Sequence, residues 1–542
     1  MFKGFNDRLQ TLLTTAGGEP LRGGRIGLEK ESLRVTPTGT LSPADHPETL
    51  GAPLTHPFIT TDFSEALIEL ITPPYPDHER TLAFLDELHR EVYAKIGDEL
   101  LWATSMPCII AGKSSIPIAR YGSSNVGHMK EVYRRGLALR YDPVMQLISG
   151  VHFNYSPPQP LWSALLGPGA GDPPERDAVS DAYFGLTRNF LRYGWIVPYL
   201  FGSSPAVCKS FFPDDVAPDF DEFDAGTWYR RYATSLRMSD IGYKNSSQQD
   251  LSISYDSLHS YVSSLTRAIE TPSPEYARLG VKDGDDYRQL NANVLQIENE
   301  YYSTIRPKQL ARSGEAPTLA LSRRGVLYVE IRSLDVDPQQ PLGVSADAMR
   351  FIEALLLLCL ICPSPPLSAE ERKDCARNLD TVASRGREPG VALRVDGTER
   401  SLRDCAIALC EALVPLCTAL DGDATDGPFM RTLAAQRKAA DDPELTASAR
   451  ILATMRDRDE SFFQFAMHCS QAHAAGFRAR PLPAELQRDY DQEAARSHAQ
   501  QAAVEAADQV DFDVFLERYF HQGARLREEA LAQLRGRGVK MR

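Results

Sequence analysis

An alternation of polar and apolar side chains near the N-terminus predicts a β-strand with two acidic residues on one face. Residues 25–35 read Arg-Ile-Gly-Leu-Glu-Lys-Glu-Ser-Leu-Arg-Val, and the period of two in a strand places Glu29 and Glu31 on the same side. Two carboxylates on one face repel each other, and a divalent cation held by oxygen ligands would let them lie together. The alternative is a solvated strand face, because an exposed carboxylate needs no partner.

Two later segments predict strands of the same kind. Residues 146–156 alternate so that His152 and Asn154 share one face, while the apolar side chains between them occupy the other. Residues 326–333 alternate as cleanly, with their branched apolar residues directed toward a core. The opposite, polar face of this last segment carries Tyr328, Glu330 and Arg332.

The type of element formed by residues 60–74 is ambiguous. On a helix, the spacing i, i+3, i+7 would place three acidic residues on one side, namely Asp62, Glu65 and Glu69. We favour a strand from about Ala66, because Pro73 and Pro74 end the segment and Glu69 stands alone among apolar residues. A carboxylate in that position needs a partner.

The remaining pattern predicts helices and loops around these strands. Residues 79–98 have amphipathic helical spacing, and from residue 345 onward most of the chain favours helix. Residues 354–362 form an apolar run far shorter than the ~20 residues of a membrane span, which indicates a buried helix. Residues 156–176 and 211–226 are rich in proline, glycine and acidic residues and predict loops.

Composition and charge indicate a globular protein whose partners are not polyanions. The 542 residues are 43% hydrophobic and 24% charged, with a net charge of −14, which disfavours nucleic acid or an anionic membrane surface as a partner. The N-terminus lacks the apolar core of a secretory signal. The nine cysteines are odd in number and lie mostly in apolar, helical sequence, so we expect free thiols in a reducing cytoplasm.

Short motifs of several common enzyme classes find no support in the sequence. Gly112-Lys113-Ser114 resembles the end of a phosphate-binding loop, but that motif requires a glycine where Pro107 stands. Neither H-E-x-x-H nor G-x-S-x-G occurs. The sequence therefore gives no support to zinc-protease or serine-hydrolase chemistry.

The acidic strand positions, taken together, suggest a metal centre. Glu29, Glu31, Glu69 and Glu330 each fall where alternation directs them to one side of a sheet, and His152 behaves likewise. Oxygen ligands with a single imidazole favour magnesium or manganese over zinc or copper, and such clusters bridge metals to nucleotide phosphates. The cationic residues that would bind phosphates or substrate carboxylates are Arg134, Arg237, Lys308 and Arg332. For each of these four taken singly, a surface ion pair is the alternative.

Six blocks of sequence, in order along the chain, closely resemble the proteobacterial glutamate–cysteine ligases, or γ-glutamylcysteine synthetases. The blocks are residues 27–35, 60–69, 148–154, 197–205, 233–240 and 328–335. The resemblance runs from about residue 20 into the helical C-terminal region. It implies an enzyme that couples ATP hydrolysis to joining the γ-carboxylate of L-glutamate to the amine of L-cysteine. That reaction is the first step of glutathione biosynthesis, and it proceeds through γ-glutamyl phosphate with release of ADP and phosphate.

The resemblance also implies the architecture. The family fold is α+β, with a curved, mainly antiparallel sheet that forms a funnel-shaped active site and helices outside it, as in glutamine synthetase. We expect residues 1–362 to form the ligase catalytic core and residues 363–520 to form a mostly helical region packed on it. Residues 521–542 are expected to be a flexible basic tail.

Roles for individual residues follow from the same resemblance. The implied metal ligands are Glu29, Glu31, Asp62, Glu69, His152 and Glu330. Lys308 and Arg332 are implied nucleotide contacts, and Arg332, Arg237 and Glu330 are implied catalytic groups. The implied substrate-binding residues are Arg134, Arg237, Tyr133, Tyr243, Tyr302 and Asn154.

Cofactors and partners are implied in the same way. The metal would be Mg²⁺, with Mn²⁺ as an alternative, ATP would be the co-substrate, and glutathione would act as a feedback inhibitor. We expect a cytoplasmic monomer without nucleic-acid or membrane partners. Lys30 stands where the family more commonly has arginine, and we expect it to point away from the metal face. Some family members carry a surface disulfide, but Cys375 has no nearby partner in residues 391–397, so we expect no bridge.

Two other functions stay open from the sequence. One is a related ligase that joins a carboxylate to a different amine, which an assay of phosphate release with cysteine and other amino acids would separate. The other is a catalytically silent protein that binds metal and nucleotide, against which the intact acidic set argues.

Overall fold

A seven-stranded antiparallel sheet forms the centre of the structure. The computed structural model describes residues 2–107, 109–167, 169, 171, 174–212, 219–242, 251–422, 424 and 426–523. The strands of the sheet are β1 (Arg25–Val35), β2 (Ile59–Thr61), β3 (Leu67–Ile71), β4 (Leu100–Leu101), β5 (Gly150–Ser156), β11 (Ile305–Lys308) and β12 (Tyr328–Asp335). Their order is β11–β12–β5–β1–β3–β2, with β4 paired to the end of β1, and every neighbouring pair is antiparallel.

The strands predicted from alternation are therefore confirmed, and the ambiguous segment is resolved. Residues 60–74 form no helix: β2 ends at Thr61 and β3 begins at Leu67, one residue after the predicted start. The register pairs Glu29 with His152, and Glu31 with Glu69. Because paired residues in adjacent strands point to the same side of a sheet, the acidic residues share one face.

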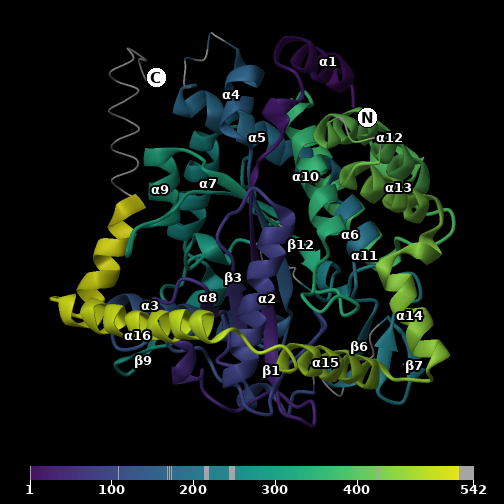
Figure 1. Ribbon diagram of the computed structural model, residues 1–542. Coiled ribbons are helices and arrows are strands. Elements are labelled where there is room, and N and C mark those ends of the chain that lie inside the picture. The colour runs from purple at the N-terminus through teal and green to yellow at the C-terminus, as the bar shows by residue number, and fades with distance from the viewer. Residues whose placement is uncertain are drawn as a thin grey trace, which may run out of the picture.

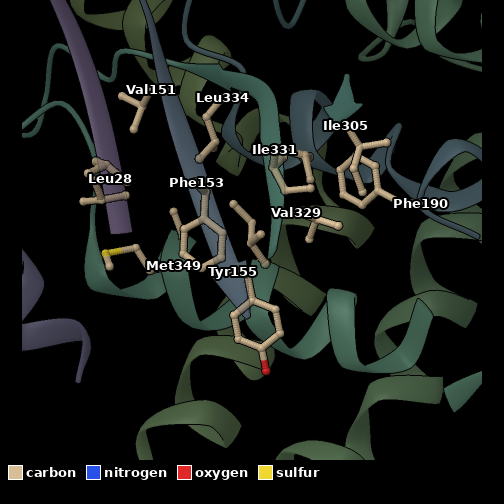
Figure 2. Packing of buried hydrophobic residues seen from close by; sticks show 14 of the residues in the cluster. Leu28, Val151, Phe153, Tyr155, Phe190, Ile305, Val329, Ile331, Leu334 and Met349 are labelled. Atoms are coloured by element: carbon tan, nitrogen blue, oxygen red, sulfur yellow. The ribbon is translucent and has the colours of Figure 1, made fainter. Parts of the chain in front are cut away.

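The opposite face of the sheet is apolar and carries the main core. Figure 2 shows Leu28, Phe153 and Ile331 together on this side, each with no exposed surface. Met349 of α10 (Ala346–Ile361) and Phe190 of α5 (Arg176–Tyr193) pack against it. Helices thus cover the apolar face of the sheet, while the opposite face carries the acidic residues.

Helix α10 contains the apolar run that was predicted to be a buried helix. Residues 354–361 are each at most 5% exposed, because α10 lies between the sheet and the helices outside it (Figure 1). Among the described residues, no helix combines the length and the apolar character that crossing a bilayer demands.

Most other helices lie around the sheet, and the long C-terminal ones follow residue 345 as predicted. The helices not yet named are α1 (Phe5–Ala16), α2 (His78–Lys95), α3 (Asn125–Arg140), α4 (Gln159–Leu166), α6 (Ile196–Phe201), α7 (Leu258–Glu270), α8 (Pro274–Leu279), α9 (Pro317–Arg324), α11 (Ala369–Arg385), α12 (Leu402–Asp421), α13 (Pro428–Asp441), α14 (Ala447–Asp457), α15 (Phe462–Arg478) and α16 (Ala484–Ala507). The smaller strands are β6 (Ala206–Cys208), β7 (Asp221–Asp224), β8 (Thr227–Tyr229), β9 (Lys282–Asp283), β10 (Asp286–Tyr287), β13 (Ala392–Val395) and β14 (Thr398–Ser401).

One helix and three short strands among these elements differ from the sequence prediction. Helix α4 lies inside the predicted loop 156–176, because its proline occupies the first turn, where a missing N–H is tolerated, and Leu161 and Trp162 are buried. Strand β7 falls in the predicted loop 211–226. The β13–β14 hairpin interrupts the helical region at a turn in which Asp396 has a positive φ.

A buried ion pair fastens α3 to the segment that leads into β11. The side chains of Arg140, at the end of α3, and Glu300 have no exposed surface, and Arg140 Nη1 lies 3.0 Å from Glu300 Oε1. The Tyr141 hydroxyl donates to the same oxygen at 2.6 Å, and Arg140 Nη2 donates to the Asn291 carbonyl at 2.7 Å. Burial raises the pKa of Glu300, and the Arg140 guanidinium opposes that rise.

We predict that Arg140→Met destabilises the protein by about 3–5 kcal/mol at neutral pH, because it leaves a buried carboxylate without its cation. A pKa raised above 4.5 means that the folded state holds the proton more tightly, so the penalty grows as pH rises through the folded-state pKa. Thermal midpoints should therefore differ most near neutral pH and converge toward pH 4.5. The double variant Arg140→Met/Glu300→Gln should recover most of the loss; no recovery would mean that packing, not charge, is what Arg140 provides.

Candidate functional site

Three strands bring a carboxylate–imidazole cluster together on the polar face. One ligand atom each of Glu29 (β1), His152 (β5) and Glu330 (β12) lies within 4.8 Å of the other two. His152 Nδ1 is 3.0 Å from Glu29 Oε2 and 3.9 Å from Glu330 Oε1. Glu29 also accepts a hydrogen bond from Asn154 Nδ2 at 2.8 Å. The cluster is the one that strand alternation predicted.

Glu31, Glu69 and Asp62 extend this cluster toward β3. Glu31 Oε1 lies 3.9 Å from His152 Nε2, and Glu31 Oε2 accepts from the Gly150 amide at 2.7 Å. Burial, followed by repulsion from Glu29, Asp62 and the other acids, raises the pKa of Glu69 well above its usual value. The pKa of Glu31 is raised as well, first by burial.

Glu330 is the carboxylate that the protein itself neutralises. Lys308 Nζ lies 3.0 Å from Glu330 Oε1, and Arg332 Nη1 donates to Oε2 at 3.2 Å. Burial would raise the pKa of Glu330, but Lys308, Arg332 and His152 outweigh it and hold the pKa well below its usual range. Arg306 pairs in register with Glu330 and adds positive charge from β11. The cluster therefore has an ionised end at β12 and a strongly repelled end at β3.

Helix α3 presents two cations beside the β3 end of the cluster. Arg134 Nη2 lies 3.7 Å from Asp62 Oδ1, and its Nε donates to the Asp62 carbonyl. Lys130, one helical turn earlier, places its ammonium 4.9 Å from the ring centre of Tyr121, and the Arg134 guanidinium lies 4.6 Å from the same ring. Burial, then the Arg134 charge, lowers the pKa of Lys130 to about 8.

Arg237 lies next to the backbone of Arg332 and has no exposed surface. Its Nη1 donates to the Arg332 carbonyl at 2.8 Å, where the pairing of β12 with β5 shifts register between Ile331 and Leu334. A Cβ at Gly150 would overlap the guanidinium, so glycine is required there for Arg237 to approach. A register shift of this kind redirects side chains at the end of a strand.

Tyrosines line a cavity beside Arg332. This cavity, of about 810 Å³, is bordered by Arg332, Tyr255, Tyr301 and Tyr302, among others. The Tyr302 hydroxyl accepts from Gln146 Nε2 at 2.9 Å. Tyr133 precedes Arg134 on α3. The predicted site residue Tyr243 lies outside the described residues.

Sequence reasoning missed several polar groups of the site. Lys130 had a detectable signal, because it precedes Arg134 by four residues and therefore shares its helix face. Arg306 had one as well, since it shares a strand face with Lys308. No sequence pattern indicated Gln146 or Asp335. Each belongs to the site through contacts that only the folded chain creates, with Tyr302 and with Arg237 respectively.

Lys30 points away from the polar face, as expected. It is 3% exposed, and its Nζ lies 2.9 Å from His89 Nε2 on α2. Cys375 is a free cysteine on α11 and borders the same cavity as Tyr302.

Comparisons with known proteins show which family the chain resembles along most of its length. The family model described as glutamate–cysteine ligase matches residues 9–382. The chain is 45% identical over 524 residues to a glutamate–cysteine ligase of Alcanivorax borkumensis, covering 96% of this chain and 100% of that protein. It is 48% identical over 518 residues to the one from Azotobacter vinelandii, with 95% and 98% covered. A crystal structure of the Francisella tularensis glutamate–cysteine ligase in complex with AMP superposes with a TM-score of 0.88 at 36% identity, covering 93% of this chain and 99% of that one.

The fold, the acidic site and these matches define an enzyme of the class that ligates a carboxylate to an amine. The chain belongs to the glutamate–cysteine ligase family. Its activity is the ligation of glutamate to cysteine, the first step of glutathione synthesis. This assignment decides against the two alternatives that the sequence left open, a ligase for another amine and a silent binding protein.

We predict that Glu69→Gln raises the thermal midpoint in buffer that contains a chelator, by roughly one to a few degrees. The raised pKa of Glu69 means that its ionisation opposes folding, and this penalty appears as pH rises above 4.5. The gain in the variant should thus be largest at neutral pH and disappear below pH 4.5. A variant less stable than the parent at neutral pH, without metal, would show that Glu69 is not repelled.

Proposed function

We propose that the polar face of the sheet is the catalytic centre, with six residues as ligands for Mg²⁺ or Mn²⁺. The proposed ligands are Glu29, Glu31, Asp62, Glu69, His152 and Glu330. The observation that carries this proposal is the approach of Glu29, His152 and Glu330 to within 4.8 Å of one another from three separate strands. Like charges buried at this distance need a cation to coexist.

The chemistry of the donors supports a hard divalent cation. Carboxylate oxygens predominate, a single imidazole is present, and no cysteine belongs to the cluster. His152 Nε2 is buried and makes no hydrogen bond within the described structure, so a buried nitrogen is available as a ligand. When bound, the metal would neutralise charge on the phosphates and on the attacking carboxylate.

The order of residues along β12 supports an arrangement with two ends. Lys308 pairs in register with Tyr328 at one end of the polar face, and Arg332 and Arg237 lie at the other, with Glu330 between them. We assign the nucleotide phosphates to the Lys308 end. We assign the amino acids to the cavity bordered by Arg332 and Tyr302, so that Arg332 would stand between the phosphates and the amino acids.

A carboxylate resists attack by an amine because it lacks a good leaving group, and ATP removes this obstacle. The γ-carboxylate of glutamate attacks the γ-phosphorus of ATP, which gives γ-glutamyl phosphate and ADP. The amine of cysteine then attacks the acyl carbon, and the tetrahedral intermediate collapses to γ-glutamylcysteine and phosphate. Phosphoryl transfer demands positioning and charge neutralisation more than covalent chemistry from the protein.

This chain supplies both through its cations. Lys308 and Arg332, on either side of Glu330, would hold the phosphates and take up charge on the transferring phosphoryl group. Arg134 and Arg237 would orient substrate carboxylates, because guanidinium groups bind carboxylates through paired hydrogen bonds. Asn154, by its bond to Glu29, would hold that carboxylate in place.

The remaining parts of the proposal concern specificity and setting. Tyr133, Tyr302 and Tyr243 would shape the cysteine pocket, and glutathione would inhibit by feedback. We also propose a cytoplasmic monomer with a core at residues 1–362, a packed helical region at 363–520 and a flexible basic tail. Of that tail, only residues 521–523 are described, and they belong to a helix that begins at residue 512; the rest lies outside the described residues.

We predict that Glu330→Gln leaves the protein folded but lowers ADP formation on the order of 100-fold or more, because it removes the central charged ligand. The measurement is ADP release with saturating glutamate, cysteine and ATP, together with a thermal midpoint to verify folding. Glu275→Gln, at an exposed position in the first turn of α8, is the matched control and should behave as the parent. Turnover like that of the parent in Glu330→Gln would remove this residue from the metal set.

We also predict that Mg²⁺ raises the thermal midpoint of the protein without nucleotide. Binding to the folded state alone stabilises it by roughly 2.7 kcal/mol at a concentration 100 times the dissociation constant. Glu29→Gln should lose most of this shift, whereas Glu275→Gln should keep it. An equal shift in all three proteins would place the bound cation elsewhere.

A further inference from the structure

The end of the described chain forms a strap across one side of the molecule. We define the C-terminal strap as residues 505–522, which include the end of α16 and the helical residues 512–522. Figure 1 shows α16 crossing the molecule beside α3, after which the chain turns toward α9. The strap carries none of the proposed ligands or substrate contacts, yet it contacts three segments that lead to them.

The first contact is with the N-terminus of α3. The Asn125 amide, the first of the helix, donates to Asp508 Oδ2 at 2.5 Å, and the Asn125 side chain donates to the Val510 carbonyl at 2.9 Å. The Ser123 amide donates to Glu505 Oε1 at 2.8 Å. The first amides of a helix have no partner inside it and carry partial positive charge, so a carboxylate there both caps the helix and fixes its position.

The other two contacts join the strap to the segments before β11 and β12. Asp513 accepts from the Tyr287 hydroxyl at 2.6 Å and from Lys282 Nζ at 2.9 Å, on the β9–β10 hairpin. Gln522 Oε1 accepts at 2.9 Å from the amide of Ala316, the residue before α9. Helix α9 connects β11 to β12. The strap therefore spans from α3 to segments that precede the strands carrying Lys308 and Glu330.

These contacts define how α3 is held. Its C-terminal end is fixed by the buried pair of Arg140 with Glu300, and its N-terminal end is held by the strap. Arg134 lies between the two anchors. If α3 moves as a rigid rod about Arg140, about two fifths of any displacement at Asn125 reaches Arg134. A cap at residue 125 thus controls the position of a guanidinium proposed to bind substrate.

We propose that Asp508 is a positioning residue: through the Asn125 amide it sets α3 so that Arg134 meets the amino-acid substrate. This inference rests on the proposed role of Arg134 as a substrate-binding residue. Asp508 touches no proposed ligand, substrate contact or reacting group. Its effect should consequently appear in the affinity for one amino acid and not in the chemical step.

The test is steady-state kinetics on the full-length protein, with glutamate, cysteine and ATP varied separately. Arg134→Lys identifies the amino acid whose KM depends on the guanidinium. Asp508→Ala should raise the KM for that same amino acid about three- to ten-fold, while kcat and the KM for ATP change less than two-fold. Asp508→Asn keeps an acceptor oxygen and should restore values near those of the parent.

A second variant tests the same contact from the other side. Asn125→Pro removes both hydrogen bonds that Asn125 donates to the strap, and proline is tolerated at the first position of a helix, after a residue as extended as Ser124. It should reproduce the KM pattern of Asp508→Ala. The double variant should have a KM no higher than that of the more impaired single variant, because both remove the same contact. The matched control is Asp491→Ala, which removes a contact of α16 with Lys95 of α2 and should leave every KM unchanged.

The outcomes separate this proposal from the one it rests on. If Arg134→Lys raises a KM and Asp508→Ala lowers only the thermal midpoint, the positioning role of Asp508 is wrong and the role of Arg134 stands. An equal rise in all three KM values would likewise overturn it, because the strap would then act on the fold as a whole. If Arg134→Lys changes no KM, the substrate role of Arg134 fails, and the inference about Asp508 fails with it.

Discussion

The structure depends on one constraint: several carboxylates must lie close together on one face of a sheet whose other face is the core. Period-two alternation produces this arrangement directly, because each residue that points to the core is followed by one that points to the site. The apolar face, with Phe153 and Ile331, gives the sheet its stability. The polar face has the opposite effect, since Glu29, Glu31 and Glu69 repel one another across β1 and β3. A site of this kind is tolerated only where burial on the reverse side exceeds the repulsion.

The cations of the chain are not spread evenly over the acidic face, and this uneven distribution determines where an added cation or an anion would bind. Lys308 and Arg332 hold Glu330 ionised, whereas burial and the neighbouring carboxylates raise the pKa of Glu69. The β12 end therefore carries a net positive charge, while the β3 end retains an excess of negative charge. An added cation gains most at the β3 end. The β12 end, with two cations beside one carboxylate, suits an anionic phosphate instead.

The parts of the site that the sequence predicted are those that strand geometry determines. Glu29, His152 and Glu330 share a face because each stands at an alternating position, and alternation is visible without any tertiary information. The strands themselves were predictable for the same reason, including the ambiguous one that holds Glu69. The approach of these acidic side chains, the fold class and the family were thus accessible from the chain alone, although the family came from matching blocks and not from periodicity.

What could not be predicted depends on contacts between distant segments. Helix α4 was hidden by its prolines, and the β13–β14 hairpin by the helical composition around it. Arg140 and Glu300 are 160 residues apart, and no local pattern pairs them.

The site therefore has two parts: side chains placed by strand geometry and side chains placed by contacts between distant segments. The groups proposed to bind metal and phosphate stand on strands of a sheet whose register the core enforces, so their spacing tolerates changes elsewhere. Arg134 and Tyr133 instead stand on a helix that lies over the sheet, and their distance from the strands is set by an ion pair at one end of α3 and by the strap at the other. Side chains are positioned more precisely on helices and strands than on loops. Helix α3 is itself rigid, but its position relative to the sheet depends on the contacts at its two ends. If the proposed roles hold, the strands around Glu330 fix the reacting groups, and a shift of α3 would change substrate affinity without altering the chemical step.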